Sequence, residues 1–255
     1  MTLQSHRLPA NWILQPGALA DRVVLVTGAY GGLGAAVARA AARAGATVVI
    51  TGRRRRQLEQ LYDAMLAEQL PEPVIHPLDL EAATPNDYQA VADGLERDFG
   101  RLDGIVHAAA SFDGLTPIAM HKPDEWLRAL HVNVSAPFAL TQACMPLLTA
   151  APDSAVVFLL DDPALVRKAH WGAYGVAKAA TERFVEILHQ ETENTPLRTQ
   201  ALLPAPMRTA LRRQAYFGED TSQLPLPDTA AEAAVYLLSA QGAAARGGML
   251  DLRHD

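Results

Sequence analysis

Short apolar runs alternate along this chain with longer stretches in which apolar residues recur at helical spacing. The runs are brief and rich in Val and Ile, which is typical of strands buried in a sheet. We predict strands at residues 23–26, 47–51, 74–77, 104–107, 155–160, 198–203 and 249–252. The helical periodicity falls between them, at residues 32–44, 54–70, 86–99, 123–148, 173–193 and 229–239.

This alternation predicts an α/β fold, in which a doubly wound parallel sheet of about seven strands carries helices on both faces. No linker rich in proline or glycine divides the series, so we expect a single domain over residues 21–255. Residues 1–20 precede the first strand and are expected to form an N-terminal extension on the surface. Residues 204–227 have little pattern, as an active-site lid often does.

Composition narrows the classes of partner. With 255 residues, of which 49% are hydrophobic, the chain suits one well-cored domain. A net charge of −6 gives no basic field for nucleic acid or an anionic membrane surface, so we expect a small-molecule substrate. We find no apolar run long enough for a membrane span and no signal peptide, and therefore expect a cytoplasmic protein. The eight histidines show no metal-ligand spacing, so no metal is expected.

A glycine-rich loop follows the first predicted strand. It reads Thr27-Gly28-Ala29-Tyr30-Gly31-Gly32-Leu33-Gly34 and leads directly into a helix. Glycine permits the tight turn and lets the backbone approach a pyrophosphate at the start of a helix. In this position the loop indicates a dinucleotide site.

Four arginines follow the second predicted strand, at residues 53–56. An acid near this point would bind the ribose hydroxyls of NAD, whereas arginine suits the 2′-phosphate of NADP. The pattern therefore favours NADP. Asp79, after the third strand, is placed either to accept the adenine amino group or to cap a turn.

Tyr174 and Lys178 lie four residues apart in a predicted helix, which puts them on one face. A phenol has a pKa of about 10, and a nearby cation favours its ionised form. The pair is therefore a candidate device for proton transfer. The alternative is an exposed tyrosine beside a solvated lysine.

In this order the motifs resemble the short-chain dehydrogenase/reductase family, and within it the YciK-like branch of bacterial oxidoreductases. The glycine loop matches the family fingerprint, Tyr174 and Lys178 match its Tyr-x-x-x-Lys, and Asn133 matches its active-site asparagine. The resemblance implies a Rossmann domain in which Tyr174 is the acid/base, Lys178 lowers its pKa and holds the nicotinamide ribose, and Asn133 positions a water. It also implies a homodimer or homotetramer and these cofactor-binding residues: Gly28, Tyr30, Gly31, Gly32, Leu33, Gly34, Arg53, Arg54, Asp79, Leu80, Ala109, Tyr174, Lys178, Pro204, Met207 and Thr209.

The family carries a substrate-orienting serine thirteen residues before the tyrosine, and this chain has Asp161 there. An ionised carboxylate only accepts hydrogen bonds, and it would repel negative charge developing on a substrate oxygen. Either Asp161 stays protonated in an apolar pocket and donates, or Arg167 or Lys168 pairs with Asp161 and Asp162 and turns the loop away. We count Asp161 among the candidate catalytic residues.

Two further segments depart from the family pattern. Ala108-Ala109-Ala110 stands where Asn-Ala-Gly is usual, and Pro204-Ala205-Pro206 where Pro-Gly is usual. Alanine for glycine is unfavourable only where the backbone needs a positive φ.

Three functions fit the sequence. The first is an NADP(H)-dependent oxidoreductase that interconverts a carbonyl and an alcohol. The second is a catalytically impaired or inactive dinucleotide-binding protein with a sensor or structural role, and the third is an isomerase or lyase that uses Asp161 for proton abstraction.

Overall fold

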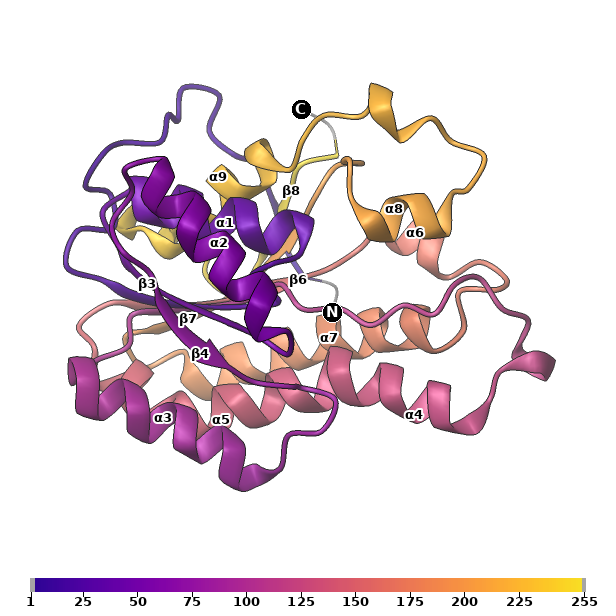
Figure 1. Cartoon of the computed structure of the whole chain (residues 1–255), viewed down its shortest axis with the longest axis horizontal. Helices are drawn as coiled ribbons and strands as arrows, with labels where there is room; N and C mark the ends of the chain where they lie inside the picture. The colour runs from indigo at the N-terminus through magenta and orange to yellow at the C-terminus, as the bar shows by residue number, and fades with distance from the viewer. Residues whose placement is uncertain (1–2, 254–255) are drawn as a thin grey trace.

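A computed structural model describes residues 3–253 and shows one parallel sheet between two layers of helices (Figure 1). The strand order is β1-β8-β7-β6-β5-β2-β3-β4, and every neighbouring pair is parallel. The predicted doubly wound α/β fold is confirmed, with eight strands rather than about seven. The strands are β1 (Ser5–His6), β2 (Val23–Thr27), β3 (Thr47–Gly52), β4 (Val74–Pro77), β5 (Gly104–His107), β6 (Ser154–Leu159), β7 (Leu197–Leu203) and β8 (Met249–Asp251).

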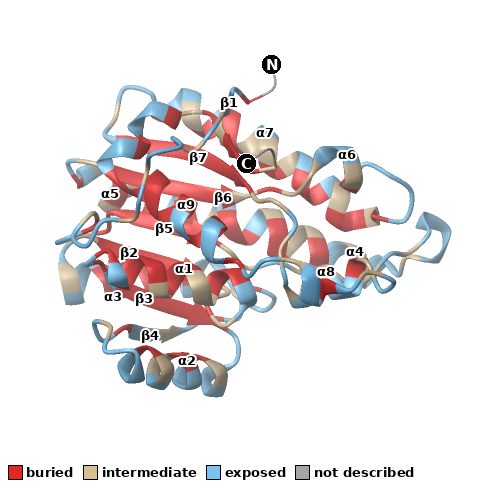
Figure 2. Cartoon of the chain, turned by 90° about the horizontal axis from the view of Figure 1, so that it is seen from above, coloured by how far each residue is buried: buried red, intermediate tan, exposed pale blue. Residues whose placement is uncertain are grey.

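Helices cover both faces of the sheet. One layer contains α1 (Gly32–Arg43), α2 (Arg55–Ala67) and α9 (Asp228–Leu238), and the other contains α3 (Pro85–Phe99), α4 (Pro123–Leu130), α5 (Ala136–Ala150) and α7 (Gly172–Thr192) (Figure 1). The short helices α6 (Pro163–Val166) and α8 (Ala210–Ala215) lie beyond the ends of the strands. Buried apolar residues form one large cluster on each side of the sheet, which is why the central strands appear wholly buried in Figure 2.

The N-terminal segment does more than cover the surface. Ser5 and His6 pair with Met249 and Leu250, so the segment adds an edge strand that the sequence pattern did not reveal. Leu19, just before β2, is fully buried. A two-residue strand has too little periodicity to be recognised from sequence.

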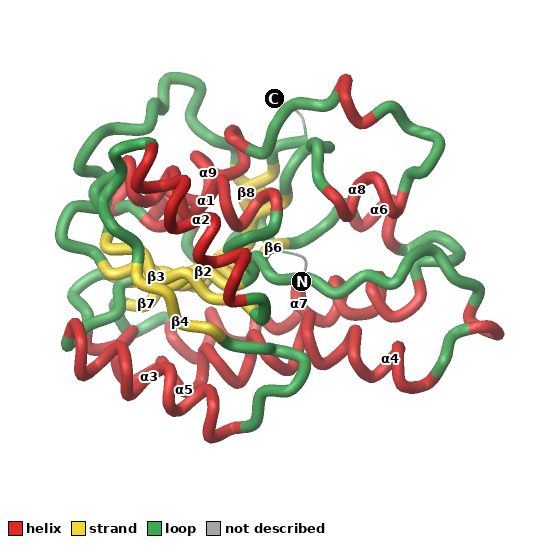
Figure 3. The backbone as a smooth tube through the Cα atoms, in the orientation of Figure 1, coloured by secondary structure: helices red, strands yellow, loops and turns green. Residues whose placement is uncertain are grey.

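The predicted helix at residues 123–148 is interrupted. A π-helical turn, His131–Ser135, separates α4 from α5 and contains Asn133. Such bulges occur mostly as single turns within α-helices and often at functional sites. The unpatterned residues 204–227 contain α8 and a 3₁₀ turn at Thr221–Gln223, joined by loops (Figure 3).

The fold places a crevice at the centre of the sheet. From β2 the chain winds outward to β3 and β4 and then returns to β5 on the other side of β2. Connections on the two sides therefore diverge at the carboxyl ends of β2 and β5, the point where ligands bind in open α/β sheets.

Candidate active site

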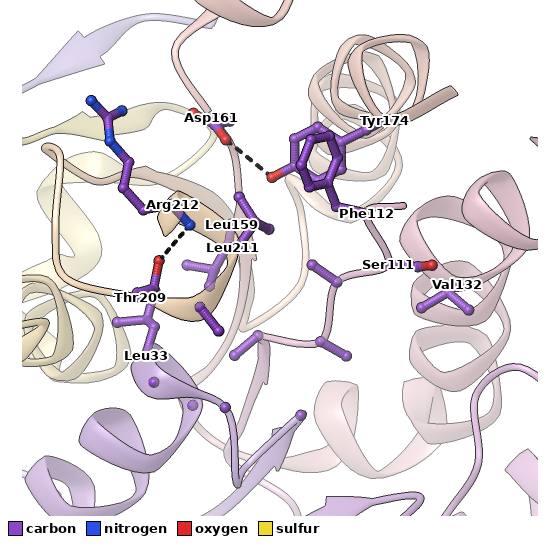
Figure 4. A pocket seen from close by; sticks show the side chains of 18 of the residues that line it. Leu33, Ser111, Phe112, Val132, Leu159, Asp161, Tyr174, Thr209, Leu211 and Arg212 are labelled. Carbon is purple, nitrogen blue, oxygen red and sulfur yellow. Dashed lines mark hydrogen bonds between the residues drawn. The ribbon is translucent and has the colours of Figure 1, made fainter. Parts of the chain in front are cut away.

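A cavity of about 940 Å³ lies along the carboxyl ends of the strands. Its walls come from the loop after β2, the ends of β3 to β6, the start of α7, and the segment that includes α8 (Figure 4). Every catalytic and cofactor-binding residue predicted from the sequence lines it, except Asn133. The structure thus brings the predicted residues together, while their individual roles stay predictions.

The loop after β2 requires glycine at two positions. Gly28 has a φ of +60°, and a Cβ there would lie 2.6 Å from the Cα of Ala109. A Cβ on Gly34 would lie 2.3 Å from the carbonyl oxygen of Gly28. Helix α1 starts at Gly32 with no side-chain cap, so its first N–H groups are available to an anion in the cavity.

Arginines occupy the cavity end next to β3. Arg53 Nη1 lies 2.9 Å from Glu81 Oε2, and this ion pair is about half exposed. The side chain of Arg54 has no acidic partner among residues 3–253. Arg128 contacts both Glu81 and Asp113, so these ion pairs form a chain at the cavity mouth. Glu81 and Arg128 were not predicted, because nothing in their local sequence sets them apart.

Asp79 also lines this end of the cavity. Its Oδ1 accepts a hydrogen bond from the backbone N–H of Glu81 at 3.1 Å, so it caps the turn after β4. The turn-capping alternative raised by the sequence is therefore present, and it leaves the other carboxylate oxygen without a partner in the described chain.

Tyr174 and Asp161 are hydrogen-bonded to each other inside the cavity. Tyr174 Oη donates to Asp161 Oδ2 at 3.0 Å, as Figure 4 shows. Burial, together with the charge of Asp161 and this hydrogen bond, raises the pKa of Tyr174 well above its usual value. The lowered phenol pKa that the family resemblance implies is therefore not what this geometry produces.

Lys178 lies one helical turn beyond Tyr174 and is also buried. Its Nζ donates to the carbonyl oxygen of Leu159 at 2.7 Å and lies 5.3 Å from the centre of the Tyr174 ring. Burial lowers the pKa of Lys178 to about 8, although the charge of Asp161 partly opposes that shift. The alternative of an exposed tyrosine beside a solvated lysine is wrong, because both side chains are buried.

The acidic pair after β6 is not held by Arg167 or Lys168, whereas the protonated form of Asp161 stays a prediction. Asp161 Oδ1 accepts the backbone N–H of Asp162 at 2.8 Å, and among the described residues Asp161 has no Lys, Arg or His within ion-pair distance. Asp162 pairs with Arg253 at 2.7 Å and caps α6 through the N–H of Ala164. Neither Arg167 nor Lys168 forms an ion pair with them.

Asn133 lies behind the cavity wall. Its side-chain amide donates to the carbonyl oxygens of Ser111 and Ala129 and accepts the N–H of Ser111. The backbone carbonyl oxygen of Asn133 accepts a hydrogen bond from the Thr181 hydroxyl at 3.2 Å. Asn133 thus ties the loop after β5 to the π-helical turn, and the water-positioning role stays a prediction.

Aromatic rings surround the Tyr174 side chain. The ring of Phe112 is 5.2 Å from that of Tyr174, and the ring of Trp171 is 5.8 Å from it. Tyr216, after α8, lies 6.0 Å from Trp171 and carries the guanidinium of Arg212 on its face at 3.6 Å. All of these residues line the cavity. We call Phe112, Trp171, Tyr174 and Tyr216 the aromatic wall.

The short chain dehydrogenase family model matches residues 22–219. The chain belongs to this family. The uncharacterized oxidoreductase YciK of Escherichia coli K12 is 36% identical over 209 residues, which span 82% of each chain. A short chain dehydrogenase from Shigella flexneri 2a, complexed with NADP, matches with a TM-score of 0.89 at 32% identity, covering 93% of this chain and 99% of that one. One from Escherichia coli CFT073, complexed with NADPH, matches with a TM-score of 0.89 at 33% identity, covering 93% and 98%.

The departures from the short-chain dehydrogenase pattern cause no backbone strain. In the described part of the chain the non-glycine residues with positive φ are Asp21, Gln69 and His170, so Ala110 and Ala205 have ordinary backbones. Alanine at these positions adds a methyl group to the cavity wall without forcing the chain out of shape.

Membrane-spanning helices and clusters of metal-ligating side chains are both absent from the described residues. Within residues 3–253, no helix combines the length and apolarity needed to cross a membrane. The same residues contain no group of three or more side chains of the kinds that ligate metals.

Proposed function

We propose that this protein is an NADP(H)-dependent oxidoreductase that interconverts a carbonyl and an alcohol, with Asp161 in place of the family serine. The observation that carries the proposal is the hydrogen-bonded pair of Tyr174 and Asp161 in one cavity with the glycine loop and Arg53. A proton donor and a dinucleotide site are the two components that such a reaction requires.

The cofactor half of the proposal is supported from three sides. Gly28 and Gly34 permit the close backbone contacts that shape the loop after β2, and α1 begins there without a side-chain cap. Arg54 offers a guanidinium without an acidic partner in residues 3–253, which suits a 2′-phosphate. The relatives from Shigella flexneri and Escherichia coli CFT073 are complexed with NADP and NADPH. When bound, the nicotinamide supplies or accepts a hydride.

The residues around Tyr174 favour the direction of reduction. Its raised pKa keeps the phenol protonated at neutral pH, so it is poised as an acid rather than as a base. Lys178 uses one of its three N–H groups on Leu159, which leaves two to hold ribose hydroxyls. A carbonyl oxygen must draw the Tyr174 proton away from Asp161, because the phenol already donates there.

The test begins with the cofactor. Saturable binding of NADPH, measured by fluorescence or calorimetry, is expected, and its absence at millimolar concentration would refute the proposal. Wild type, Tyr174→Phe and Asp161→Ser are then compared on a panel of ketones and aldehydes. Loss of a wild-type rate in Tyr174→Phe supports Tyr174 as the acid.

A catalytically impaired dinucleotide-binding protein is the second candidate. It is favoured by the raised pKa of Tyr174 and by the use of its hydroxyl on Asp161. In that case wild type binds NADPH but reduces no member of the panel, and Asp161→Ser gains turnover because a donor replaces an acceptor.

We further propose a homodimer in the cytoplasm. Phe138 on α5 and Ile187 on α7 are about half exposed, although both are large and apolar. The two helices pack together through Phe138 and Phe184, whose ring centres are 5.9 Å apart. Large apolar side chains exposed on two neighbouring helices suit contact with a second copy of the chain, and light scattering tests it.

A further inference from the structure

We infer that the substrate of this site carries a carbon–nitrogen double bond, protonated as an iminium cation that Asp161 holds. The inference rests on the NADP(H)-dependent oxidoreductase activity proposed above, and it replaces the carbonyl substrate of that proposal with an iminium. It follows from the carboxylate that lines the cavity beside the proposed proton donor, as Figure 4 shows, and from the aromatic wall next to Tyr174.

A carboxylate at this position is poorly suited to a carbonyl. Both Asp161 oxygens are already acceptors, one for Tyr174 Oη and one for the backbone N–H of Asp162. A substrate carbonyl offers another acceptor, so it cannot hydrogen-bond to the ionised group. During reduction the carbonyl oxygen gains negative charge, which Asp161 would repel.

An iminium nitrogen has the opposite requirements. It carries positive charge, and its N–H needs an acceptor, which a carboxylate oxygen with a remaining lone pair provides. A nearby negative charge also favours the protonated form of an imine, which accepts hydride more readily than the neutral form. Asp161 is suited to this role because no cation in residues 3–253 forms an ion pair with it, whereas neighbouring Asp162 is paired with Arg253.

The aromatic wall supports a cationic substrate independently of Asp161. Aromatic faces attract cations, and a set of rings around a site is a known way to bind ammonium groups. Phe112, Trp171 and Tyr174 have ring centres 5.2 to 5.8 Å from one another. Tyr216 already carries the guanidinium of Arg212 on its ring.

The charged side chains near Asp161 are engaged with other partners and do not neutralise its carboxylate. Arg212 is neutralised by a two-point ion pair with Glu219, and Arg253 lies between Asp162 and Asp251. Lys178 stays protonated at neutral pH, because burial lowers its pKa only to about 8, but its Nζ is held on the Leu159 carbonyl and forms no ion pair with Asp161. Tyr174 is neutral, because its pKa is raised.

The reaction balances without a proton donor in the hydride step. A hydride from NADPH forms a new C–H bond, the two π electrons of the C=N⁺ bond become the nitrogen lone pair, and the products are a neutral amine and NADP⁺. Asp161 keeps the nitrogen in place, and Tyr174 keeps Asp161 in place through its hydrogen bond. Ketone reduction, in contrast, requires the Tyr174 proton.

Binding gives the first test. Calorimetry of wild type loaded with NADP⁺ compares 1,2,3,4-tetrahydroisoquinoline, a cyclic ammonium at neutral pH, with isochroman, its neutral ether analogue. We expect the ammonium to bind more tightly and Asp161→Asn to weaken it about tenfold or more, as for a lost charge-assisted hydrogen bond. The matched control, Asp162→Asn, keeps the helix cap and should change the affinity less than about twofold.

Turnover gives the second test. Wild type with NADPH should reduce 3,4-dihydroisoquinoline faster than the ketone 2-tetralone, and Asp161→Ser should reverse that preference. Tyr174→Phe should lower ketone reduction more than iminium reduction, since only the ketone takes a proton in the hydride step.

Failure is distinguishable from failure of the proposed function. If wild type binds no NADP⁺ or NADPH, the oxidoreductase proposal itself is wrong. If the cofactor binds but Asp161→Asn leaves ammonium affinity unchanged, or wild type prefers the ketone or leaves the imine unreduced, the iminium inference is overturned while the oxidoreductase proposal stands. Thermal melts of Asp161→Asn and Asp162→Asn show whether both variants are folded.

Discussion

Replacing Arg53 with glutamine tests the cofactor assignment most directly. The guanidinium lines the cavity beside β3 and is now paired with Glu81 at 2.9 Å, where both side chains are about half exposed. In the proposed complex Arg53 would turn from Glu81 to the 2′-phosphate of NADP(H), a group that NAD(H) lacks. Arg53→Gln should therefore weaken NADPH selectively.

The expected magnitude follows from the two interactions. A hydrogen bond to a charged group contributes about 1.5–3 kcal/mol. Breaking an exposed ion pair such as Arg53–Glu81, as Arg53 must do to bind the phosphate, costs about 0.2–1 kcal/mol of binding free energy. The difference of about 1–2 kcal/mol corresponds to a roughly 5- to 30-fold loss of NADPH affinity.

Fluorescence titration measures the affinities for NADPH and NADH that this prediction compares. NADH affinity should change less than about twofold, and Arg56→Gln, an arginine of the same run that does not line the cavity, should leave both affinities unchanged. Glu81→Gln should tighten NADPH by up to about fivefold, because it removes the competing acid. Equal weakening of NADPH and NADH by Arg53→Gln would refute the reasoning, as would a loss of NADPH affinity in Glu81→Gln.

Three further outcomes are expected. Burial holds the pKa of Lys178 near 8, below its ordinary 10.5, so between these values the unfolded chain binds more protons at this group than the folded chain does. The contribution of Lys178 to the unfolding free energy should therefore rise by about 2 kcal/mol from pH 8 to 10, and the difference between wild type and Lys178→Met in urea titrations should grow by that amount. Asp153→Ala should lower the unfolding free energy by about 2–3 kcal/mol in urea titrations, because it leaves the buried Arg198 without its acidic partner. The control Asp98→Ala removes an exposed ion pair and should change the unfolding free energy by less than about 0.5 kcal/mol. Equal losses in the two variants would contradict this prediction. Ile187→Glu should shift the protein from dimer to monomer in light scattering without changing NADPH affinity, and an unchanged mass would exclude α7 from the interface.

Local patterns in the sequence were enough for the main elements. Strands such as β4 and β5 lie at the predicted bounds, because an apolar run between turns is a local property. The glycine loop was recognisable for the same reason, since the clash at Gly34 involves Gly28 only six residues earlier. Tyr174 and Lys178 share a helix face because that follows from helical spacing alone.

Elements that depend on distant partners escaped prediction. β1 forms only because Ser5 meets Met249 across the sheet, and its two residues have no pattern of their own. The interruption at Asn133 is another case, because apolar spacing continues through the π-helical turn and gives no sign of it.

The sequence determined which residues form the candidate site, whereas the tertiary structure decided their burial and their hydrogen-bond and ion-pair partners. Asp161 could be located by counting back from Tyr174, but the sequence left open whether it is protonated or paired with Arg167 or Lys168. The structure excludes that pairing: Tyr174 donates to Asp161, and Arg253, which is 91 residues from Asp162 in the chain, holds the neighbouring carboxylate. The physical reason is that burial and charge pairing depend on which segments meet at the ends of the strands, and they set whether a carboxylate is neutralised or left to receive a cation.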